Sequence, residues 1–332
     1  MNSLPRVLYV NTTLNPMTHK NSKLWAASID YSEYLTVPRR FRTIEQMLRL
    51  DFLLALKVRK MAKDFDVIFA GSERVGIPLA YLKLDRPLIT VVHHIASLPK
   101  KELMKFAKPH LRWHNIGYLS RADCDFMRSE FGVSQEKMFR FIAAPLSEFT
   151  PSEEEIDGPI ISVGASKRDY QTLIDAMRSL PNYPIEIYPS SQFYDLYDGD
   201  LSELPRSIMI KPHISQQEIA AKYAKSPFMV LPLHDTTQFS AGVSTALEAA
   251  AAGKAIIATH TKGMPDYVID GRTGILVPPG DIESLRQAIC KLIEEPQLAQ
   301  EMGRNARKHV ERHFDPAEIE RSTQKVIENL CQ

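Results

Sequence analysis

Short runs of hydrophobic and β-branched residues alternate along the chain with segments whose apolar residues recur at helical spacing. The short runs predict strands at 6–11, 66–70, 87–93, 115–119, 138–142, 160–163, 185–188, 207–210, 228–231 and 255–259. The intervening segments predict helices at 43–63, 78–84, 120–131, 169–180, 216–225 and 316–330. Strands that alternate with helices indicate βαβ units and therefore parallel sheets.

The alternation is interrupted once, by a segment rich in proline and acidic residues. Residues 145–159 read PLSEFTPSEEEIDGP and have no periodicity, which is typical of a linker. The chain has 332 residues, enough for two domains of ordinary size. We therefore expect an α/β protein with two Rossmann-like, doubly wound parallel-sheet domains, one within residues 1–150 and one within 159–314. Ligands of such sheets bind at the carboxyl ends of the strands.

The composition excludes some classes of function but does not identify one. The net charge of +1 gives no support for extensive nucleic-acid binding. Cys124, Cys290 and Cys331 are far apart and match no metal or redox spacing. The first residues have no signal-peptide pattern, and no apolar run reaches the roughly 18 residues that span a membrane. We expect a cytoplasmic protein with reduced thiols.

The stretch from Ser240 to Asp281 carries the most chemical information. A loop of small residues, Ser240-Ala241-Gly242, leads into an alanine-rich run that ends at Gly253. Small residues at a helix start let a ligand approach free backbone N–H groups, which favours an anion such as a diphosphate. Glu248 is the one carboxylate within the alanine-rich run, and a ribose diol would be a suitable partner for it. The stretch therefore indicates a nucleotide site.

A second loop offers the positive charge that a diphosphate needs. Lys167 and Arg168 follow a predicted strand and precede a predicted helix, so they should lie at the carboxyl edge of the sheet. Arginine suits bidentate contact with phosphate, and a cation there would stabilise a departing diphosphate. The alternative is that both residues are solvated charges at a helix start.

Together these residues resemble the donor-binding half of the retaining glycosyltransferases of family 4, which have the two-domain GT-B fold. Glu248 matches the second of that family's two glutamates, and Gly253-Lys254 matches its turn after the small-residue helix. The segment 270–281, DGRTGILVPPGD, matches its characteristic ending. The resemblance covers residues 160–315 well and the first half only in topology. It implies two Rossmann-like domains that face a cleft, with a helix over 315–332 packing back toward the N-terminal domain.

The resemblance also implies an activity and a set of residues. It implies transfer of a hexosyl-type sugar from a nucleotide diphosphate sugar to an acceptor hydroxyl, with retention and without a metal. Glu248 would bind the ribose hydroxyls, and a histidine after an N-terminal-domain strand, here His93, would face the donor sugar. The residues expected to act in catalysis are Arg168, Lys167 and His93. Those expected to bind the donor are Gly164, His213, Ile214, Ser240, Ala241, Gly242, Val243, Ser244, Thr245 and Glu248.

Ser240 departs from the family pattern, which has a glutamate at this position. The sugar could be held by other residues, such as Asp235 or Gln238. The donor sugar could differ at the hydroxyl that the glutamate contacts. The protein could also bind a nucleotide sugar without transferring it efficiently. The alternative function is accordingly a non-catalytic nucleotide-sugar-binding or scaffold protein with the same fold.

Partners beyond the donor are less defined by the sequence. The co-substrate expected is a UDP- or GDP-sugar, with no further cofactor, and the acceptor could be a saccharide, a lipid-linked molecule or a small molecule. Residues 37–63 combine many lysines and arginines with apolar residues at helical spacing. Such a helix can lie peripherally on the inner face of an anionic membrane. It can equally pack its apolar stripe on the sheet as a surface helix.

Overall fold

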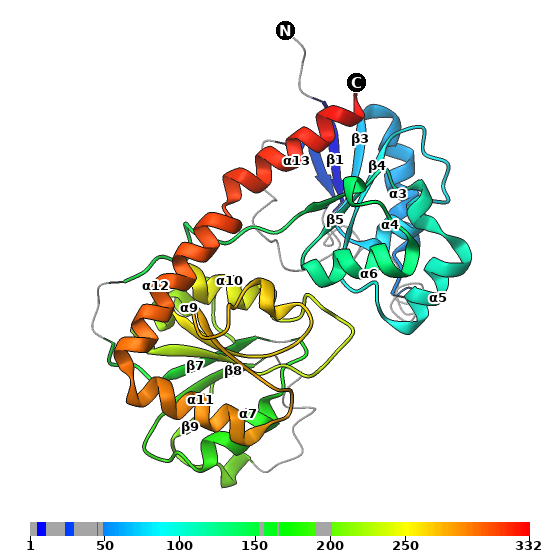
Figure 1. Ribbon diagram of the computed structural model, residues 1–332. Helices are drawn as coiled ribbons and strands as arrows, with labels where there is room; N and C mark the ends of the chain where they lie inside the picture. Colours follow the sequence, from blue (N-terminus) through cyan, green and yellow to red (C-terminus); the bar gives the residue numbers. More distant parts are fainter. Residues whose placement is uncertain are drawn as a thin grey trace. The chain divides into compact units, whose positions relative to one another are not determined.

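The computed structural model describes residues 5–10, 24–29, 45, 49–152, 156–164, 166–189 and 201–332, apart from the side chain of Ser202. The chain divides into two compact units (Figure 1). Unit 1 comprises Met1–Ile142 and Ala317–Gln332, and unit 2 comprises Ala143–Pro316.

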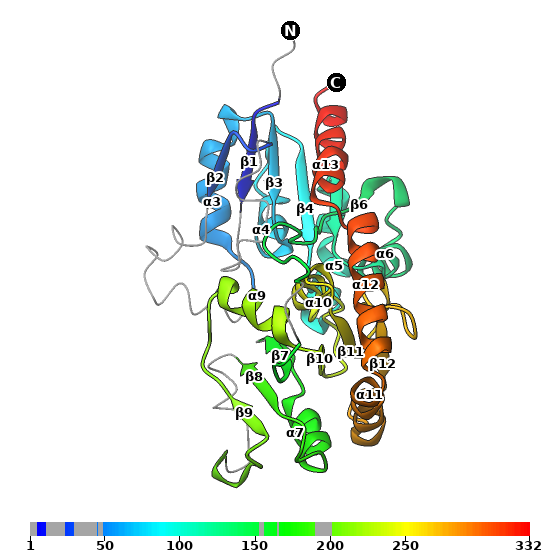
Figure 2. The same ribbon diagram turned by 90° about the vertical axis from the view of Figure 1, so that its left-hand side faces the viewer.

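Unit 1 contains a six-stranded parallel sheet in the order β2-β1-β3-β4-β5-β6 (Figure 2). Its strands are β1 Val7–Val10, β2 Ala27–Ile29, β3 Val67–Ala70, β4 Leu88–Val92, β5 Asn115–Tyr118 and β6 Met138–Arg140. Its α-helices are α3 Phe52–Met61, α4 Glu73–Leu79, α5 Leu98–Ala107, α6 Arg121–Phe131 and α13 Pro316–Leu330, of which the last begins in unit 2. Short 3₁₀ helices are η1 Ala62–Asp64, η2 Pro109–Arg112 and η3 Gln135–Lys137. Every residue of β1, β3 and β4 is buried, as expected for parallel strands that are covered on both faces.

Unit 2 contains a second six-stranded parallel sheet, in the order β12-β11-β10-β7-β8-β9. Its strands are β7 Ile160–Gly164, β8 Ile185–Pro189, β9 Ile208–Ile210, β10 Phe228–Leu231, β11 Ala255–Thr259 and β12 Gly274–Val277. Its helices are α7 Tyr170–Arg178, α9 Gln216–Lys225, α10 Val243–Ala251, α11 Ile282–Glu294 and α12 Pro296–His313, with 3₁₀ helices η4 Leu201–Glu203 and η5 Met264–Asp266. The strand order is that of the doubly wound dinucleotide-binding fold, whose direction of winding reverses between β7 and β10.

The helices of unit 2 form two layers, with α10 and α12 packed together and α7 packed against α11 (Figure 1). The alanine-rich sequence of α10 has a packing cause, because Ala246, Ala249 and Ala250 are fully buried. Glycine serves the same purpose on α12, where a Cβ atom on Gly303 would lie 2.0 Å from the carbonyl oxygen of Gly253. The small residues therefore let α10 pack in the core and let α12 approach the turn between α10 and β11 closely.

The predicted α/β class and the ten predicted strands are confirmed, with end points shifted by one or two residues at several of them. The bounds of α9, α13, β10 and β11 are those that the hydrophobic pattern predicts. In α9 a capping box explains the sharp start, since the Ser215 side chain accepts from the Glu218 N–H and the Glu218 carboxylate accepts from the Ser215 N–H.

The prediction of one helix over 43–63 is wrong within the described residues. Arg49 has a left-handed φ of 51°, and α3 begins only at Phe52. The interruption is stabilised by tertiary contacts: the Asp51 N–H donates to the Arg74 carbonyl, and the Asp51 carboxylate pairs with the Arg74 guanidinium at 2.7 Å. Residues 43–44 and 46–48 lie outside the described part of the chain.

The prediction of a helix over 78–84 is also wrong, because it takes Pro78 as a helix start. Helix α4 starts at Glu73 behind the Ser72 cap, and Pro78 lies in its last turn. Proline lacks the N–H that would bond the carbonyl four residues earlier, that of Arg74. In this fold the Arg74 carbonyl accepts instead from the Asp51 N–H at 2.9 Å. The proline is therefore tolerated inside the helix.

Candidate functional site

The carboxyl ends of β7 and β10 bring together the loops that the sequence singles out. The backbone of the loop after β7 pairs with the chain after β10: Arg168 forms an isolated bridge with Leu233, and the His234 N–H donates to the Lys167 carbonyl at 3.1 Å. Helix α10 begins shortly afterwards, at Val243. These loops lie where the winding direction of the sheet reverses, which is the usual ligand position in such folds.

The Arg168 guanidinium is held in place before any ligand binds. Its Nε donates to the Val163 carbonyl at 3.1 Å, its Nη1 to the Ser166 carbonyl at 2.8 Å, and its Nη2 to the Thr245 hydroxyl at 2.9 Å. Burial lowers the pKa of this guanidinium, although nearby Tyr170 and Glu248 act in the opposite direction. A guanidinium has five N–H donors, and two of them make no hydrogen bond to the described residues, so they are available to a ligand.

Gly164 makes this position of Arg168 possible. The glycine has a φ of 125°, which residues with a side chain rarely adopt. A Cβ atom at this position would lie 2.1 Å from the Nη2 atom of Arg168. The end of β7 therefore requires glycine both for its backbone conformation and for the space that the guanidinium occupies.

The start of α10 presents backbone donors next to Arg168. Gly242, in the left-handed conformation with a φ of 80°, precedes the first turn, and no side chain caps it. Within the described residues, the N–H groups of Ser244 and Thr245 have no backbone acceptor. The N–H groups of Ala241 and Val243 do have acceptors, the carbonyls of Gln238 and Ser240. Two N–H groups and a guanidinium thus converge on one helix start, an arrangement suited to an anion.

Glu248 lies one turn further along α10. Its side chain is partly buried, and its carboxylate makes no hydrogen bond within the part of the chain that the structure describes. Burial raises the pKa of this carboxyl to about 7, against the opposing influence of Arg168. A carboxylate in this state gains from hydroxyl donors that a ligand brings, because hydrogen bonds to the charged form favour it.

Two tyrosines belong to this site and are absent from the sequence prediction. The Tyr170 hydroxyl donates to the Gly164 carbonyl at 2.6 Å, and burial raises its pKa to about 12. Tyr223 is fully buried, and burial together with Glu248 raises its pKa. Its hydroxyl has no hydrogen-bond partner among the described residues. Tyr170 could have been suspected as the residue next to the Arg168 loop, but nothing in the sequence marks Tyr223.

The remaining predicted residues of unit 2 lie on exposed or half-buried loops. Lys167 is exposed and has a left-handed φ of 59°. Ser240 is half-buried in the turn before α10, and its carbonyl accepts from the Val243 N–H. His213 and Ile214 follow β9, the edge strand of the sheet, and their side chain and carbonyl contact each other at 2.7 Å. Two strand spacings, about 10 Å, separate β9 from β7.

Two parts of the motif that carries the resemblance hold the fold of unit 2 together. Buried Lys254 donates to the Ala224 carbonyl at 2.9 Å, and burial lowers its pKa to about 8. The Asp270 carboxylate accepts from the Leu276 N–H at 2.8 Å, and Asp281 caps α11 through the Ser284 N–H. These hydrogen bonds give Lys254, Asp270 and Asp281 a structural role in unit 2.

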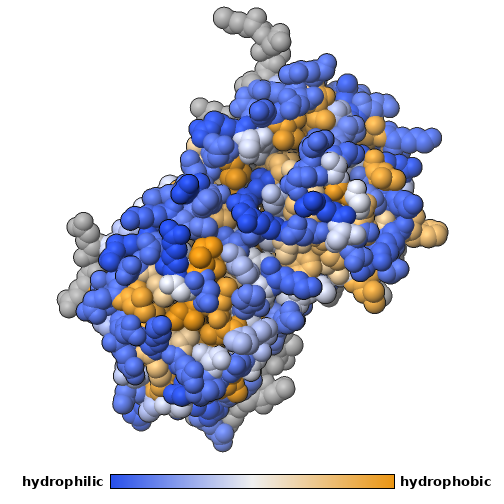
Figure 3. Space-filling view, in the orientation of Figure 1, coloured by the Kyte–Doolittle hydropathy of each residue, from blue (hydrophilic) through white to orange (hydrophobic). Residues whose placement is uncertain are grey.

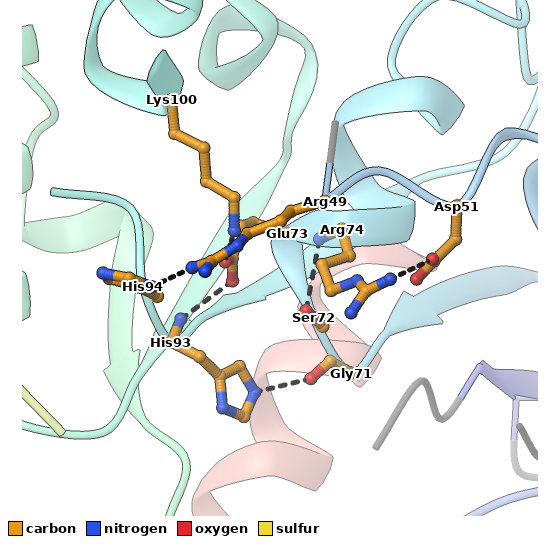
Figure 4. A network of polar contacts seen from close by, with 9 residues as sticks. All are labelled: Arg49, Asp51, Gly71, Ser72, Glu73, Arg74, His93, His94 and Lys100. Carbon is orange, nitrogen blue, oxygen red and sulfur yellow. Dashed lines mark hydrogen bonds and ion pairs between the residues drawn. The ribbon is translucent and has the colours of Figure 1, made fainter. Parts of the chain in front are cut away.

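In unit 1, His93 follows β4 and lies in a polar network with a buried ion pair (Figure 4). Its Nε2 contacts the Gly71 carbonyl at 2.7 Å, and its backbone N–H donates to Glu73 at 2.9 Å. The Glu73 carboxylate also pairs with Lys100, and both side chains are almost fully buried. Burial alone would raise the pKa of Glu73, but Lys100 and His93 lower it to about 2. The network fixes the loop that carries His93 at the carboxyl edge of β3 and β4.

The basic segment 37–63 is described only in part, since 37–44 and 46–48 lie outside the described residues. In α3 the side chains of Leu54, Ala55 and Val58 are buried in the core of unit 1. Among the described residues no helix is long and apolar enough to cross a bilayer. Within the same residues, no cluster of three or more His, Cys, Asp or Glu side chains forms a metal site.

Comparisons with known proteins identify the family and the fold. Residues 160–309 match the family model described as glycosyl transferases group 1. The D-rhamnosyltransferase WbpZ of Pseudomonas aeruginosa is 30% identical over 292 residues, which cover 81% of this chain and 76% of that enzyme. Glycogen synthase of Mycobacterium tuberculosis is 31% identical over 114 residues, 34% of this chain, and the chain spans only 27% of that enzyme's length.

Solved structures share the fold over the whole chain. The Anabaena protein HepE, crystallised with UDP and glucose, superposes with a TM-score of 0.76 at 16% identity, covering 98% of this chain and 99% of HepE. A glycosyltransferase from Rickettsia africae superposes with a TM-score of 0.74 at 14% identity and covers all of both chains.

Proposed function

Because the chain belongs to the glycosyl transferases group 1 family, we propose that it transfers a sugar from a nucleotide diphosphate sugar to an acceptor hydroxyl. The reaction retains the anomeric configuration and needs no metal ion. One observation carries the proposal: the Arg168 guanidinium is fixed against Thr245 at the start of α10, with Glu248 one helical turn away.

The donor occupies the carboxyl edge of the sheet in unit 2. Its diphosphate accepts hydrogen bonds from the N–H groups of Ser244 and Thr245 and from the two N–H donors that Arg168 keeps available. Glu248 lies three residues beyond Thr245, a rise of about 4.5 Å along the helix. That spacing suits a ribose attached to the diphosphate, with the ribose hydroxyls donating to the carboxylate.

Arg168 stabilises the charge that develops as the bond between the sugar and the diphosphate breaks. Its position is fixed by three hydrogen bonds within the protein, so little reorganisation accompanies the reaction, and such preorganised charge lowers a barrier effectively. Exposed Lys167 adds a second cation. The acceptor oxygen bonds to the anomeric carbon on the face that the diphosphate leaves, and the acceptor proton passes to a phosphate oxygen. Nucleoside diphosphate and the glycosylated acceptor are the products.

We keep His93 as the residue that the family resemblance implies for contact with the donor sugar. The family resemblance supports the assignment, and so does the fixed loop around the histidine, since Gly71 and Glu73 hold its ring and backbone. The proposal specifies a hexosyl donor and an acceptor hydroxyl. It does not identify the sugar or the acceptor further. The complex of HepE with UDP and glucose favours a UDP-sugar as the first donor to test.

The decisive assay measures release of nucleoside diphosphate from a panel of UDP- and GDP-sugars, with and without candidate acceptors. The wild-type protein should consume at least one donor, and Arg168→Ala should lower that rate by roughly 100-fold or more, the usual effect of losing a preorganised charge-stabilising donor. Arg206→Ala, at an exposed arginine of the same unit, serves as the matched control. If the protein binds nucleotide but consumes no donor, the transferase proposal fails and the non-catalytic binding or scaffold role replaces it.

Peripheral membrane contact through 37–63 stays a separate proposal. The described part of the segment supports it only on one side of α3, where Phe52 and Leu56 are 43% and 44% exposed. The opposite side of α3 packs in the core of unit 1.

A further inference from the structure

Unit 1 contains a surface cavity of about 400 Å³ at the edge of its sheet opposite to His93. Leu88, which begins β4, and His114, which precedes β5, mark this amino edge. The cavity is lined by Leu79, Ala80, Tyr81, Lys83, Leu84, Arg86, Leu88, Arg112 and His114. The proposed donor site does not use it.

Among the described residues, the charged side chains that line the cavity are all cations. They are Lys83, Arg86 and Arg112, and all three are exposed. Two of the cations are oriented by neighbours: Arg86 donates to the Lys63 carbonyl at 3.3 Å, and the Arg112 guanidinium lies 4.6 Å from the centre of the Tyr81 ring. Three cations around an apolar floor favour an anionic group such as a phosphate.

Large apolar side chains protrude next to this cavity. Phe106, near the end of α5, is 93% exposed, and Leu111, in η2, is 65% exposed. Both adjoin the lining residues, because the Tyr81 hydroxyl donates to the Ala107 carbonyl and Leu111 precedes Arg112. Exposed Lys105 and Lys108 flank Phe106. Figure 3 shows hydrophobic side chains among hydrophilic ones at the margin of unit 1 where Figure 1 labels α5.

We propose that this face of unit 1 docks on an anionic lipid surface. A lipid phosphate occupies the cavity between Lys83, Arg86 and Arg112, while Phe106 and Leu111 enter the boundary between headgroups and acyl chains.

Exposed Glu102, one helical turn from Phe106, and exposed Asp85, next to Arg86, are the acidic side chains nearest in sequence. Single apolar side chains in surroundings where cations predominate are a pattern that an anionic membrane interface accommodates. A protein partner would instead require a contiguous apolar area with fewer charges at its centre.

The surface around the cavity, with Phe106 and Leu111, differs from the basic segment 37–63 in how far its apolar side chains are exposed to a partner. On α3 the exposed apolar side chains Phe52 and Leu56 are 43% and 44% exposed, whereas Phe106 and Leu111 beside the cavity are 93% and 65% exposed. The inference does not depend on the donor chemistry, since none of these residues lies at the proposed nucleotide site.

Sedimentation with vesicles tests the inference. The full-length protein is mixed at low salt with vesicles of phosphatidylcholine alone or of phosphatidylcholine with about one third phosphatidylglycerol. We expect sedimentation only with the anionic vesicles. Because each cation near an anionic surface contributes about fivefold to binding, Lys83→Glu/Arg112→Glu should weaken binding by more than 25-fold. Phe106→Ser/Leu111→Ser should weaken it by at least tenfold.

The matched control is Arg59→Glu/Lys60→Glu on α3, which should weaken binding less than the cavity variant. Unchanged thermal unfolding and unchanged donor consumption would show that each variant is folded. The inference is overturned if the wild-type protein does not sediment with anionic vesicles, or if only the α3 variant loses binding. It is also overturned if Phe106→Ser/Leu111→Ser leaves vesicle binding intact but converts an oligomer to a monomer, which would assign the face to a second copy of the chain.

Discussion

Replacing Glu248 by glutamine should make the free protein more stable and its nucleotide complex weaker. The carboxyl pKa is raised by burial from 4.5 to about 7, so the folded state binds a proton more tightly than the unfolded state. A group of this kind stabilises the fold fully below about pH 4.5, and that contribution is lost as the pH rises through about 7. Above pH 7 the folded protein must hold an ionised, partly buried carboxylate.

The size of the pKa shift of Glu248 determines how much its ionisation destabilises the fold. One pKa unit corresponds to about 1.4 kcal/mol, so ionisation of Glu248 destabilises the fold by roughly 3 kcal/mol at most. Water screens part of this, because the side chain is only partly buried, and we expect about 1–2 kcal/mol. At about 2–4 °C per kcal/mol for a unit of this size, Glu248→Gln should raise the Tm at pH 8 by about 2–8 °C. At pH 4.5 the two proteins should differ little.

Binding should change in the opposite direction. Ribose hydroxyls donate to an ionised carboxylate in about 1.5–3 kcal/mol bonds, so Glu248→Gln should weaken UDP or GDP binding at pH 8 by about 10–100-fold. Calorimetry at pH 6 and pH 8 on both proteins isolates the contribution of Glu248 from the titration of the phosphates. Exposed Glu294, replaced by glutamine, is the control. Equal affinity of wild type and Glu248→Gln, or a lower Tm of the variant at pH 8, would refute the reasoning.

Three further predictions follow from the geometry. Arg168→Lys keeps the charge but loses the fork of donors, and initial-rate assays should find donor consumption reduced by about 100-fold with thermal unfolding nearly unchanged; wild-type rates would exclude a role in the reaction. Gly164→Ala displaces the guanidinium and strains a backbone with a φ of 125°, so it should lower both Tm and activity. Gly132→Ala, with open space around a φ of 66°, should lower only Tm; similar losses of activity in both would contradict this account. Glu73→Gln leaves Lys100 buried without its partner, so denaturant unfolding at pH 7 should show a loss of about 3–5 kcal/mol that largely recovers in Glu73→Gln/Lys100→Leu. Since the pKa of Glu73 is lowered to about 2, its stabilisation should be present above about pH 4.5 and decline toward pH 2; a cost that persists at pH 2 would argue against the ion pair.

Much of the fold follows from local sequence patterns. The strands of both sheets are short β-branched runs that tolerate burial on both faces, and α9 starts at a capping box that the sequence spells out. The predictions that are wrong fail because contacts between residues far apart in the sequence determine the structure there. The break at Arg49 depends on Asp51 pairing with Arg74, which lies 23 positions away. No local pattern contains such a contact.

The residues of the candidate site are likewise predictable from the sequence only in part. Arg168 and Glu248 are predictable because each lies in a loop or helix whose residue types suit a diphosphate or a ribose. The role of Gly164 as the space for a guanidinium depends on the folded path of the Arg168 side chain. Tyr223 reaches the site from α9, and only the packing of the unit brings it near Glu248. Lys254 and Asp270 are the reverse case: in the sequence they match the family motif, and in the structure they form hydrogen bonds that stabilise a helix end and a turn.

The central claim is that unit 2 binds a nucleoside diphosphate at the start of α10, and a crystal structure with bound UDP tests it most directly. The account predicts diphosphate oxygens within hydrogen-bond distance of the Ser244 and Thr245 N–H groups and of Arg168, and ribose hydroxyls on Glu248. A UDP molecule bound elsewhere in the chain, or bound here with Arg168 and Glu248 both out of contact, would contradict it.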